Sequence, residues 1–278
     1  MVTPIDPLQA LILDVDGTTL DTFANQHKWF SQASKMFGGN PMMPPYDAAY
    51  RTAYNSAYNA DGMPGLYTLH GIDFKSQRDP IWEAYIAFNN THVAPPIPGM
   101  DAAIKEIHAR SRVSRERNRA LRIAVNTTKL WINIDEALLA CGILPLLDSR
   151  VTKDNVQDYA TDGAARRENI GFDDYDALRK IVPEETVKNI EKPGSLMSLL
   201  TTHLLGVDPA SIVALEDSAS GIKAYHNVLF PDRRRDIYVV GVTWGYETRE
   251  ELMEGRPDAL IDKPQQLVEL LGDYGAYK

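Results

Sequence analysis

The sequence predicts an α/β fold in which helices cover both faces of a parallel sheet. Short apolar runs, each too short for a helix, alternate with longer segments of helical periodicity along most of the chain. Strands that alternate with helices pair in parallel, because the crossover helices then lie on the faces of the sheet. The expected strands are the runs 10–13, 123–126, 149–152, 212–216, 237–242 and 259–261.

The composition narrows the class of protein. A chain of 278 residues with 44% hydrophobic content can bury a full core in one large domain, or in a core with a smaller domain. A net charge of −9 argues against a nucleic-acid partner. No apolar run approaches a membrane span, and the single Cys141 cannot form an internal disulfide. The first expected strand begins too early to leave room for a signal peptide, so we expect a cytoplasmic protein without a membrane partner. The sequence leaves its oligomeric state open.

Two carboxylates follow the first expected strand. Asp14 and Asp16 come directly after the run 10–13 and precede Gly17 and Thr18, of which Thr18 is expected to hold the loop in place. The carboxyl ends of parallel strands are where such sheets bind ligands, and the i, i+2 spacing lets both side chains face the same way. Paired carboxylates are costly without a cation, and Mg²⁺ prefers carboxylate and phosphate oxygens. The alternative is that the two acids only form a turn, as Asp and Gly often do.

Three further motifs follow in order along the chain. The strand 123–126 ends in Thr127 and Thr128, Lys192 precedes a helical pattern, and the strand 212–216 ends in Glu216 and Asp217. Each motif has an ordinary structural explanation by itself: hydroxyls in a strand end, a solvated lysine and helix-capping acids. Their joint occurrence in this order favours a phosphoryl-transfer site.

In these four motifs the chain resembles the haloacid dehalogenase superfamily, in particular members similar to phosphoglycolate phosphatase and β-phosphoglucomutase. The resemblance covers nearly the whole chain and includes the segment 241–252. It implies a three-layer Rossmann-like core of residues 1–20 and 96–278, with a helical cap domain of residues 21–95 inserted after the first motif. An extra segment of about 153–190 departs from the family pattern; it could be a lid, a dimer surface or a neutral insertion.

The resemblance also implies roles for the residues of the first three motifs. Asp14 would be the nucleophile that forms an aspartyl-phosphate, and Asp16 the general acid and then the general base. Thr127, Thr128 and Lys192 would bind the phosphate together with Asp14.

The same resemblance implies Mg²⁺ as the cofactor. Its ligands would be Asp14, the backbone carbonyl of Asp16, and Asp217, with Glu216 as a further ligand or as a residue that orients one.

The expected cap carries the candidate specificity residues. Four tyrosines recur every fourth residue on one helix face from position 46 to 58, and we expect them to pack the interior of the cap with their hydroxyls at its rim. The alternative is that some of them face the substrate with nearby polar side chains; the candidates are His27, Lys28, Arg51 and Tyr54. A mobile specificity loop is expected at 59–65, and a solvated basic loop at 110–119.

The resemblance favours a Mg²⁺-dependent phosphatase that acts on a small phosphorylated metabolite, such as phosphoglycolate, a sugar phosphate or a nucleoside monophosphate. Asp16 supports this expectation, because family members that cleave carbon–halogen or carbon–phosphorus bonds generally lack an aspartate there. The first alternative is a sugar phosphomutase that uses the same two aspartates. The second is a non-catalytic, phosphate-binding regulatory protein, which the intact set of acids disfavours.

Overall fold

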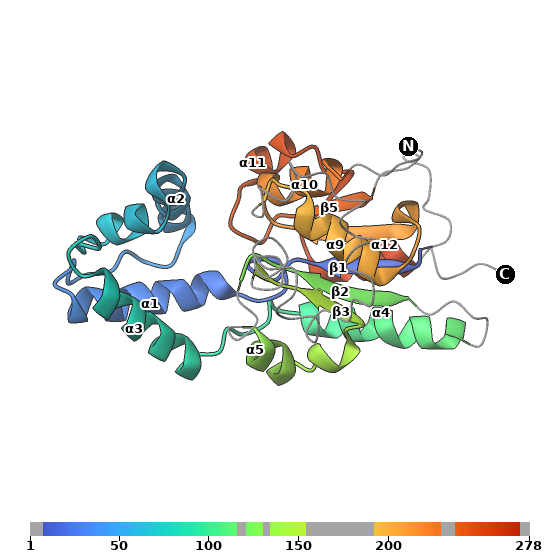
Figure 1. The fold of residues 1–278 in the computed structure, drawn as a ribbon, viewed down its shortest axis with the longest axis horizontal. Coiled ribbons are helices and arrows are strands. Elements are labelled where there is room, and N and C mark those ends of the chain that lie inside the picture. Colours follow the sequence, from blue (N-terminus) through green and yellow to red (C-terminus); the bar gives the residue numbers. More distant parts are fainter. Residues whose placement is uncertain (1–7, 116–120, 130–133, 154–191, 229–236, 273–278) are drawn as a thin grey trace, which may run out of the picture. The chain divides into compact units, whose positions relative to one another are not determined.

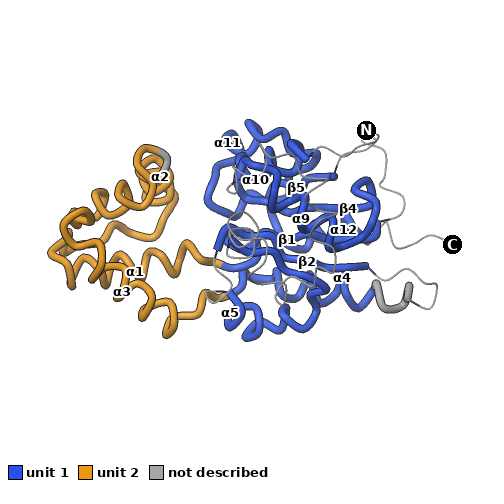
Figure 2. The backbone as a smooth tube through the Cα atoms, in the orientation of Figure 1, with its two compact units in different colours: residues 1–20, 96–278 blue, residues 21–95 orange. Residues whose placement is uncertain are grey.

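The computed structural model describes residues 8–115, 121–129, 134–153, 192–228 and 237–272. The chain divides into two compact units, one of residues 1–20 and 96–278 and the other of residues 21–95 (Figure 2). Within the described residues, no helix is both long enough and apolar enough to cross a membrane.

The larger unit is built on a six-stranded sheet in which every strand pairs in parallel with its neighbours (Figure 1). The order across the sheet is β3-β2-β1-β4-β5-β6. The strands are β1 (Ala10–Leu13), β2 (Arg122–Asn126), β3 (Ser149–Val151), β4 (Ile212–Glu216), β5 (Tyr238–Val242) and β6 (Ala259–Ile261). The predicted α/β fold with a parallel sheet is confirmed.

Helices pack on the sheet because its strands are apolar on both faces. Alternate residues of β1, β4 and β5 form one core with side chains from α9 (Leu196–Leu205), α10 (Ala219–His226) and α11 (Arg249–Glu254). The helices α4 (Met100–Arg115) and α12 (Pro264–Gly272) pack against each other, and α12 contacts β6. The short α5 (Asp135–Ala140) and the 3₁₀ turns η2 (Leu144–Leu146) and η4 (Pro209–Ser211) complete the described part of this unit.

The strand order determines where a ligand site can form. The chain leaves β1 toward β2 on one side and later returns to β4 on the other, so that the order reverses between β1 and β4. Doubly wound sheets bind ligands outside the carboxyl ends of the strands at this point. Because Leu13 is paired with Leu215, the residues after β1 and the end of β4 emerge beside each other.

The smaller unit consists of α1 (Thr22–Met36), α2 (Ala48–Leu69) and α3 (Arg78–Thr91) around an aromatic interior. Trp29 and Tyr67 are fully buried there, and the indole of Trp29 donates a hydrogen bond to the Tyr67 hydroxyl at 3.1 Å. Tyr50 and Tyr54 are also buried, whereas Tyr58 is exposed.

Three segments differ from the expected loops or lie outside the described residues. Most of the expected loop 59–65 belongs to α2, which is interrupted at Asp61 and at Gly62 (φ +57°). The backbone of 110–115 is helical, as the last part of α4, so the basic stretch is not a loop there. Of the expected insertion 153–190, only residue 153 is described.

Candidate active site

The loop after β1 presents Asp14 and Asp16 and is held by Thr19. The Thr19 hydroxyl donates to the backbone carbonyl of Asp14 at 2.6 Å, while the amides of Thr19 and Leu20 both donate to the Val15 carbonyl. These bonds close a tight turn directly after the strand. The sequence pattern predicted this task for Thr18, but the hydroxyl that fixes the loop belongs to the next residue.

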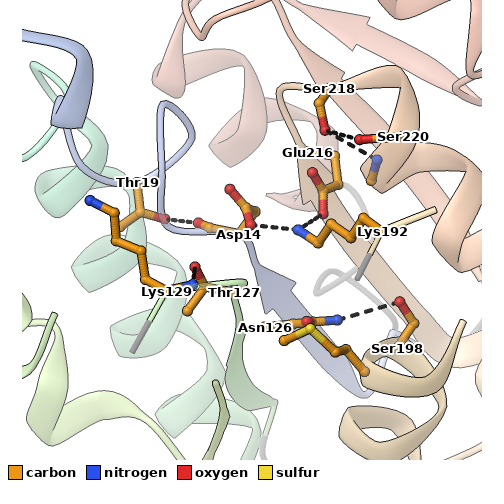
Figure 3. A network of polar contacts seen from close by, with 12 residues as sticks. Asp14, Thr19, Asn126, Thr127, Lys129, Lys192, Ser198, Glu216, Ser218 and Ser220 are labelled. Carbon is orange, nitrogen blue, oxygen red and sulfur yellow. Dashed lines mark hydrogen bonds and ion pairs between the residues drawn. The ribbon is translucent and has the colours of Figure 1, made fainter. Parts of the chain in front are cut away.

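Lys192 joins the acids of two different strands (Figure 3). Its Nζ lies 2.6 Å from Oδ1 of Asp14 and 2.5 Å from Oε1 of Glu216. The side chain of Lys192 is 8% exposed and that of Glu216 is 1% exposed, so these charges are withdrawn from water. Buried charges are tolerated when they are paired in this way.

Burial governs the protonation of the acids. Desolvation raises the pKa of Asp14, and Lys192 opposes that shift. Desolvation also raises the pKa of Glu216 to about 8 and that of Asp217 well above its ordinary value. For Lys192, burial acts to lower the pKa, but the charges of Asp14 and Glu216 raise it well above its ordinary value. Three buried carboxyl groups share one lysine, so burial favours their protonated forms, and a further cation would offset the cost of ionising them.

Asp14, Glu216 and Asp217 form a potential metal-binding group. One carboxylate oxygen from each can be chosen so that all three oxygens lie within 4.8 Å of one another, and all three residues are buried. Neither acid of the β4 motif caps the following helix, because Ser218 is the N-cap of α10 and accepts the amide of Gly221. The capping explanation for Glu216 and Asp217 is therefore wrong.

Glycines make room for the acid pair, a role that the sequence motifs did not reveal. A Cβ on Gly17 (φ +69°) would lie 2.1 Å from Oδ2 of Asp217, and a Cβ on Gly245 would lie 2.1 Å from the Asp217 Cβ. A Cβ on Gly221 would lie 2.0 Å from Oε2 of Glu216. The amide of Tyr246 donates to Oδ2 of Asp217 at 2.8 Å. Asp217 and Glu216 can therefore take these positions only because glycines, which lack a Cβ, lie next to them.

A second lysine contacts the other aspartate of the first motif. Lys129 Nζ lies 2.8 Å from Oδ1 of Asp16. The amide of Lys129 donates to Oγ1 of Thr127 at 3.2 Å, which leaves the hydroxyl proton of Thr127 for another acceptor. Thr127 is fully buried, and Thr128 next to it is partly exposed. The sequence placed Lys129 beside this motif without predicting its partner, since the partner comes from a different strand.

A buried polar network lies beside the lysine, between β2, α9 and α10 (Figure 3). The side-chain amide of Asn126 donates to the Tyr225 hydroxyl at 3.0 Å and to Oγ of Ser198 at 3.4 Å. The side-chain amide of Asn227 donates to the carbonyl of Pro193, the residue after Lys192. The Asn227 bond joins the segment that carries Lys192 to the end of α10.

The four candidate specificity residues all lie in the smaller unit, and they differ in environment. Tyr54 is 7% exposed and packs edge-on against Phe23, so it belongs to the interior. The guanidinium of Arg51 lies 5.1 Å from the centre of the Phe23 ring. His27 is partly exposed and contacts the carbonyl of Pro44 through Nε2, while Lys28 is exposed.

Comparison with known proteins gives matches only at the level of structure. No protein-family model matches the chain, and neither does any curated protein. A predicted β-phosphoglucomutase from Thermotoga maritima is 19% identical with a TM-score of 0.60, covering 95% of this chain and 99% of its own. A haloacid dehalogenase-like hydrolase from Streptococcus pneumoniae is 15% identical with a TM-score of 0.57, covering 94% of this chain and 97% of its own. A predicted phosphoglycolate phosphatase from Haemophilus somnus is 16% identical with a TM-score of 0.59, covering 95% of this chain and 97% of its own. The chain therefore has the haloacid dehalogenase-like fold that these phosphatases and phosphoglucomutases share.

Proposed function

We propose that the protein is a Mg²⁺-dependent phosphatase that hydrolyses a small phosphorylated metabolite in the cytoplasm. The observation that carries this proposal is the placement of Lys192 between Asp14 and Glu216, beside Asp217, at the reversal point of the sheet. A buried nucleophile, a lysine and paired acids at that edge suit the transfer of a phosphoryl group. The haloacid dehalogenase-like fold supports the same reaction class.

In this reaction the carboxylate of Asp14 attacks phosphorus while the bond to the leaving alcohol breaks, which forms an aspartyl-phosphate. Asp16 gives its proton to the departing alkoxide and afterwards takes a proton from the water that hydrolyses the aspartyl-phosphate. Lys192 holds Asp14 in place and offsets the repulsion between the carboxylate and the phosphate. Thr127, with Thr128 beside it, donates a hydrogen bond to a phosphate oxygen.

The acid cluster also suits Mg²⁺. Asp14, Glu216 and Asp217 offer carboxylate oxygens, which this ion prefers, and the raised pKa values of the three show how strongly burial disfavours their uncompensated charge. Asp14 and Asp217 would hold the ion with the backbone carbonyl of Asp16, and Glu216 would be a further ligand or would orient one. When bound, the ion neutralises charge on the phosphate and aligns it for attack.

We assign the choice of substrate to the unit of residues 21–95, acting as a cap domain, with His27, Lys28, Arg51 and Tyr54 as candidates for contact. Of these, the partly exposed His27 and the exposed Lys28 suit an anionic ligand better than Tyr54, which is packed in the interior. A structural neighbour from Rhodobacter sphaeroides was solved with xylulose-(1,5)bisphosphate, which supports a small phosphorylated compound as the ligand class.

A phosphomutase is the second candidate function, because a β-phosphoglucomutase from Clostridium difficile shares the fold at 14% identity and a TM-score of 0.55. A mutase would use the same two aspartates but return the phosphoryl group to the sugar instead of to water. Incubation with a sugar 1-phosphate and a catalytic amount of bisphosphate separates the two. Accumulation of an isomeric sugar phosphate without free phosphate would replace the hydrolase proposal with the mutase.

The test of the hydrolase is phosphate release from phosphoglycolate, sugar phosphates and nucleoside monophosphates, with Mg²⁺ and with chelator. Asp14→Asn removes the nucleophile and should abolish release. Asp101→Asn is the matched control, because it makes the same change at an exposed ion pair with Lys105 on α4 and should keep full activity. Turnover that persists in Asp14→Asn would refute the assignment of the nucleophile, and turnover in chelator would refute the role of the metal.

A further inference from the structure

The loop after β5 contacts both acid-bearing loops of the site. We call residues 244–247 the bracing loop. The indole Nε1 of Trp244 donates to the carbonyl of Thr18 at 3.1 Å, in the loop after β1. The amide of Tyr246 donates to Oδ2 of Asp217, after β4, at 2.8 Å. The carboxylate of Glu247 accepts the amide of Ala219 at 2.6 Å. The bracing loop thus forms hydrogen bonds with the segments after β1 and after β4, on both sides of the reversal point.

Gly17 links the atom that Trp244 bonds to the carboxylate of Asp217. Gly17 precedes Thr18 and lies so close to Asp217 that a Cβ on it would be 2.1 Å from Oδ2 and 2.7 Å from the Tyr246 ring. Holding the Thr18 carbonyl therefore keeps the Gly17 backbone pressed against Asp217. The same carboxylate is also approached by Gly245 and accepts a hydrogen bond from the Tyr246 amide.

The first acid loop also leads directly into the smaller unit. Within seven residues of Asp14 the chain leaves the larger unit, whose boundary falls after Leu20. The segment that presents Asp14 and Asp16 is therefore also the segment that leads into the smaller unit. Along the chain, Thr18 lies between Asp16 and this boundary. The bond from Trp244 to the Thr18 carbonyl therefore fixes the backbone at a point between the acids and the smaller unit.

We propose that Trp244 is a positioning residue that sets the affinity of the acid cluster for its divalent cation by pinning the Thr18 carbonyl. The inference rests on the proposed function in one respect, that Asp14 and Asp217 hold a cation. An indole suits the task, because it is rigid, has few rotatable bonds and offers only a donor. Partners that orient metal ligands typically change metal affinity by about 10–100-fold when they are removed.

The test replaces the N–H of Trp244 and measures cation binding without turnover. Trp244→Phe removes the donor, and site-specific benzothienylalanine at position 244 replaces only the N–H by sulfur while it keeps the shape of the ring. Trp82→Phe is the matched control, since Trp82 is 46% exposed on α3 in the smaller unit. Binding of Mn²⁺ alone is followed by electron paramagnetic resonance, and the unfolding temperature of the metal-free protein is measured for every variant.

We expect both replacements at position 244 to weaken Mn²⁺ binding about tenfold, while Trp82→Phe binds as the parent does. For the benzothienylalanine variant we expect the unfolding temperature to stay close to that of the parent. A Mn²⁺ dissociation constant within twofold of the parent value in this variant would overturn the inference about Trp244 and leave the phosphatase proposal standing. If the parent itself binds no Mn²⁺, the metal-dependent function fails, and the inference fails with it.

Discussion

Gly17→Ala probes how closely the first acid loop and Asp217 must approach, and a matched glycine separates that effect from backbone strain. Gly17 has φ of +69° and Gly99 has φ of +87°, so alanine is strained at both positions. Both residues belong to the larger unit. At Gly99 no described atom lies within 4 Å of the added Cβ, whereas at Gly17 the Cβ falls 2.1 Å from Oδ2 of Asp217. The two variants share the strain and differ in the collision.

The magnitude can be worked from the displacement that the Cβ enforces. Oδ2 of Asp217 has to retreat from 2.1 Å to the 3.4 Å at which ordinary contact begins, a shift of 3.4 − 2.1 = 1.3 Å. A shift of that size is enough to break the 2.8 Å hydrogen bond from the Tyr246 amide. Overpacking costs about 1–3 kcal/mol and loss of a bond to a carboxylate about 1.5–3 kcal/mol. Positive φ alone costs alanine about 1–2 kcal/mol. Together these effects predict a loss of about 3.5–8 kcal/mol of unfolding free energy for Gly17→Ala, and about 1–2 kcal/mol for Gly99→Ala, where only the strain applies.

The assay is urea unfolding of both variants, together with the Mn²⁺ dissociation constant. Displacement of Asp217 should weaken Mn²⁺ binding by at least about tenfold in Gly17→Ala and leave Gly99→Ala unchanged. Equal stability losses in the two variants would show that Gly17 is required only for its backbone conformation. Unchanged Mn²⁺ affinity in Gly17→Ala would refute the placement of Asp217 in the cation site.

Three further predictions concern the buried charges and the smaller unit. Lys192→Met should abolish turnover and lower the free energy of unfolding by about 3–5 kcal/mol, measured in denaturant at neutral pH. The reason is that Asp14 and Glu216 stay buried without the lysine ammonium that pairs with them. A fully active variant would contradict this. The metal-free protein should lose stability as pH rises from about 4.5 to about 8. Folding raises the pKa of Glu216 to about 8, so over this range the folded state keeps a proton that the unfolded chain releases. A melting temperature that rises with pH over this range would contradict this prediction. Tyr67→Phe should lower the free energy of unfolding of the smaller unit by about 1–3 kcal/mol, because the buried indole N–H of Trp29 loses its acceptor. An unchanged unfolding curve would show that this hydrogen bond does not stabilise the unit.

Much of the larger unit could be read from local patterns. The strands were predicted to within a residue or so, because short apolar runs bounded by polar residues are typical of buried parallel strands. Loops were predicted less well. The segment around Asp61 and Gly62 has the composition of a loop, yet helix continues on both sides of a local break. The basic stretch that begins at residue 110 continues α4 to Arg115, since the arginines in it are good helix formers.

The sequence by itself determined which residues are candidates for the chemistry of this protein, because each motif is a local pattern at the end of a strand or the start of a helix. It predicted Asp14, Lys192, Glu216 and Asp217 as members of one site without showing how they meet. Only the tertiary structure decided that Lys192 bridges the acids of β1 and β4 and that Lys129 contacts Asp16. It also decided that Gly17 and Gly245 lie against Asp217 and that Trp244 donates to the carbonyl of Thr18. Those contacts join residues far apart in the chain, and their geometry depends on strand order and on the absence of single Cβ atoms, which a local pattern does not encode.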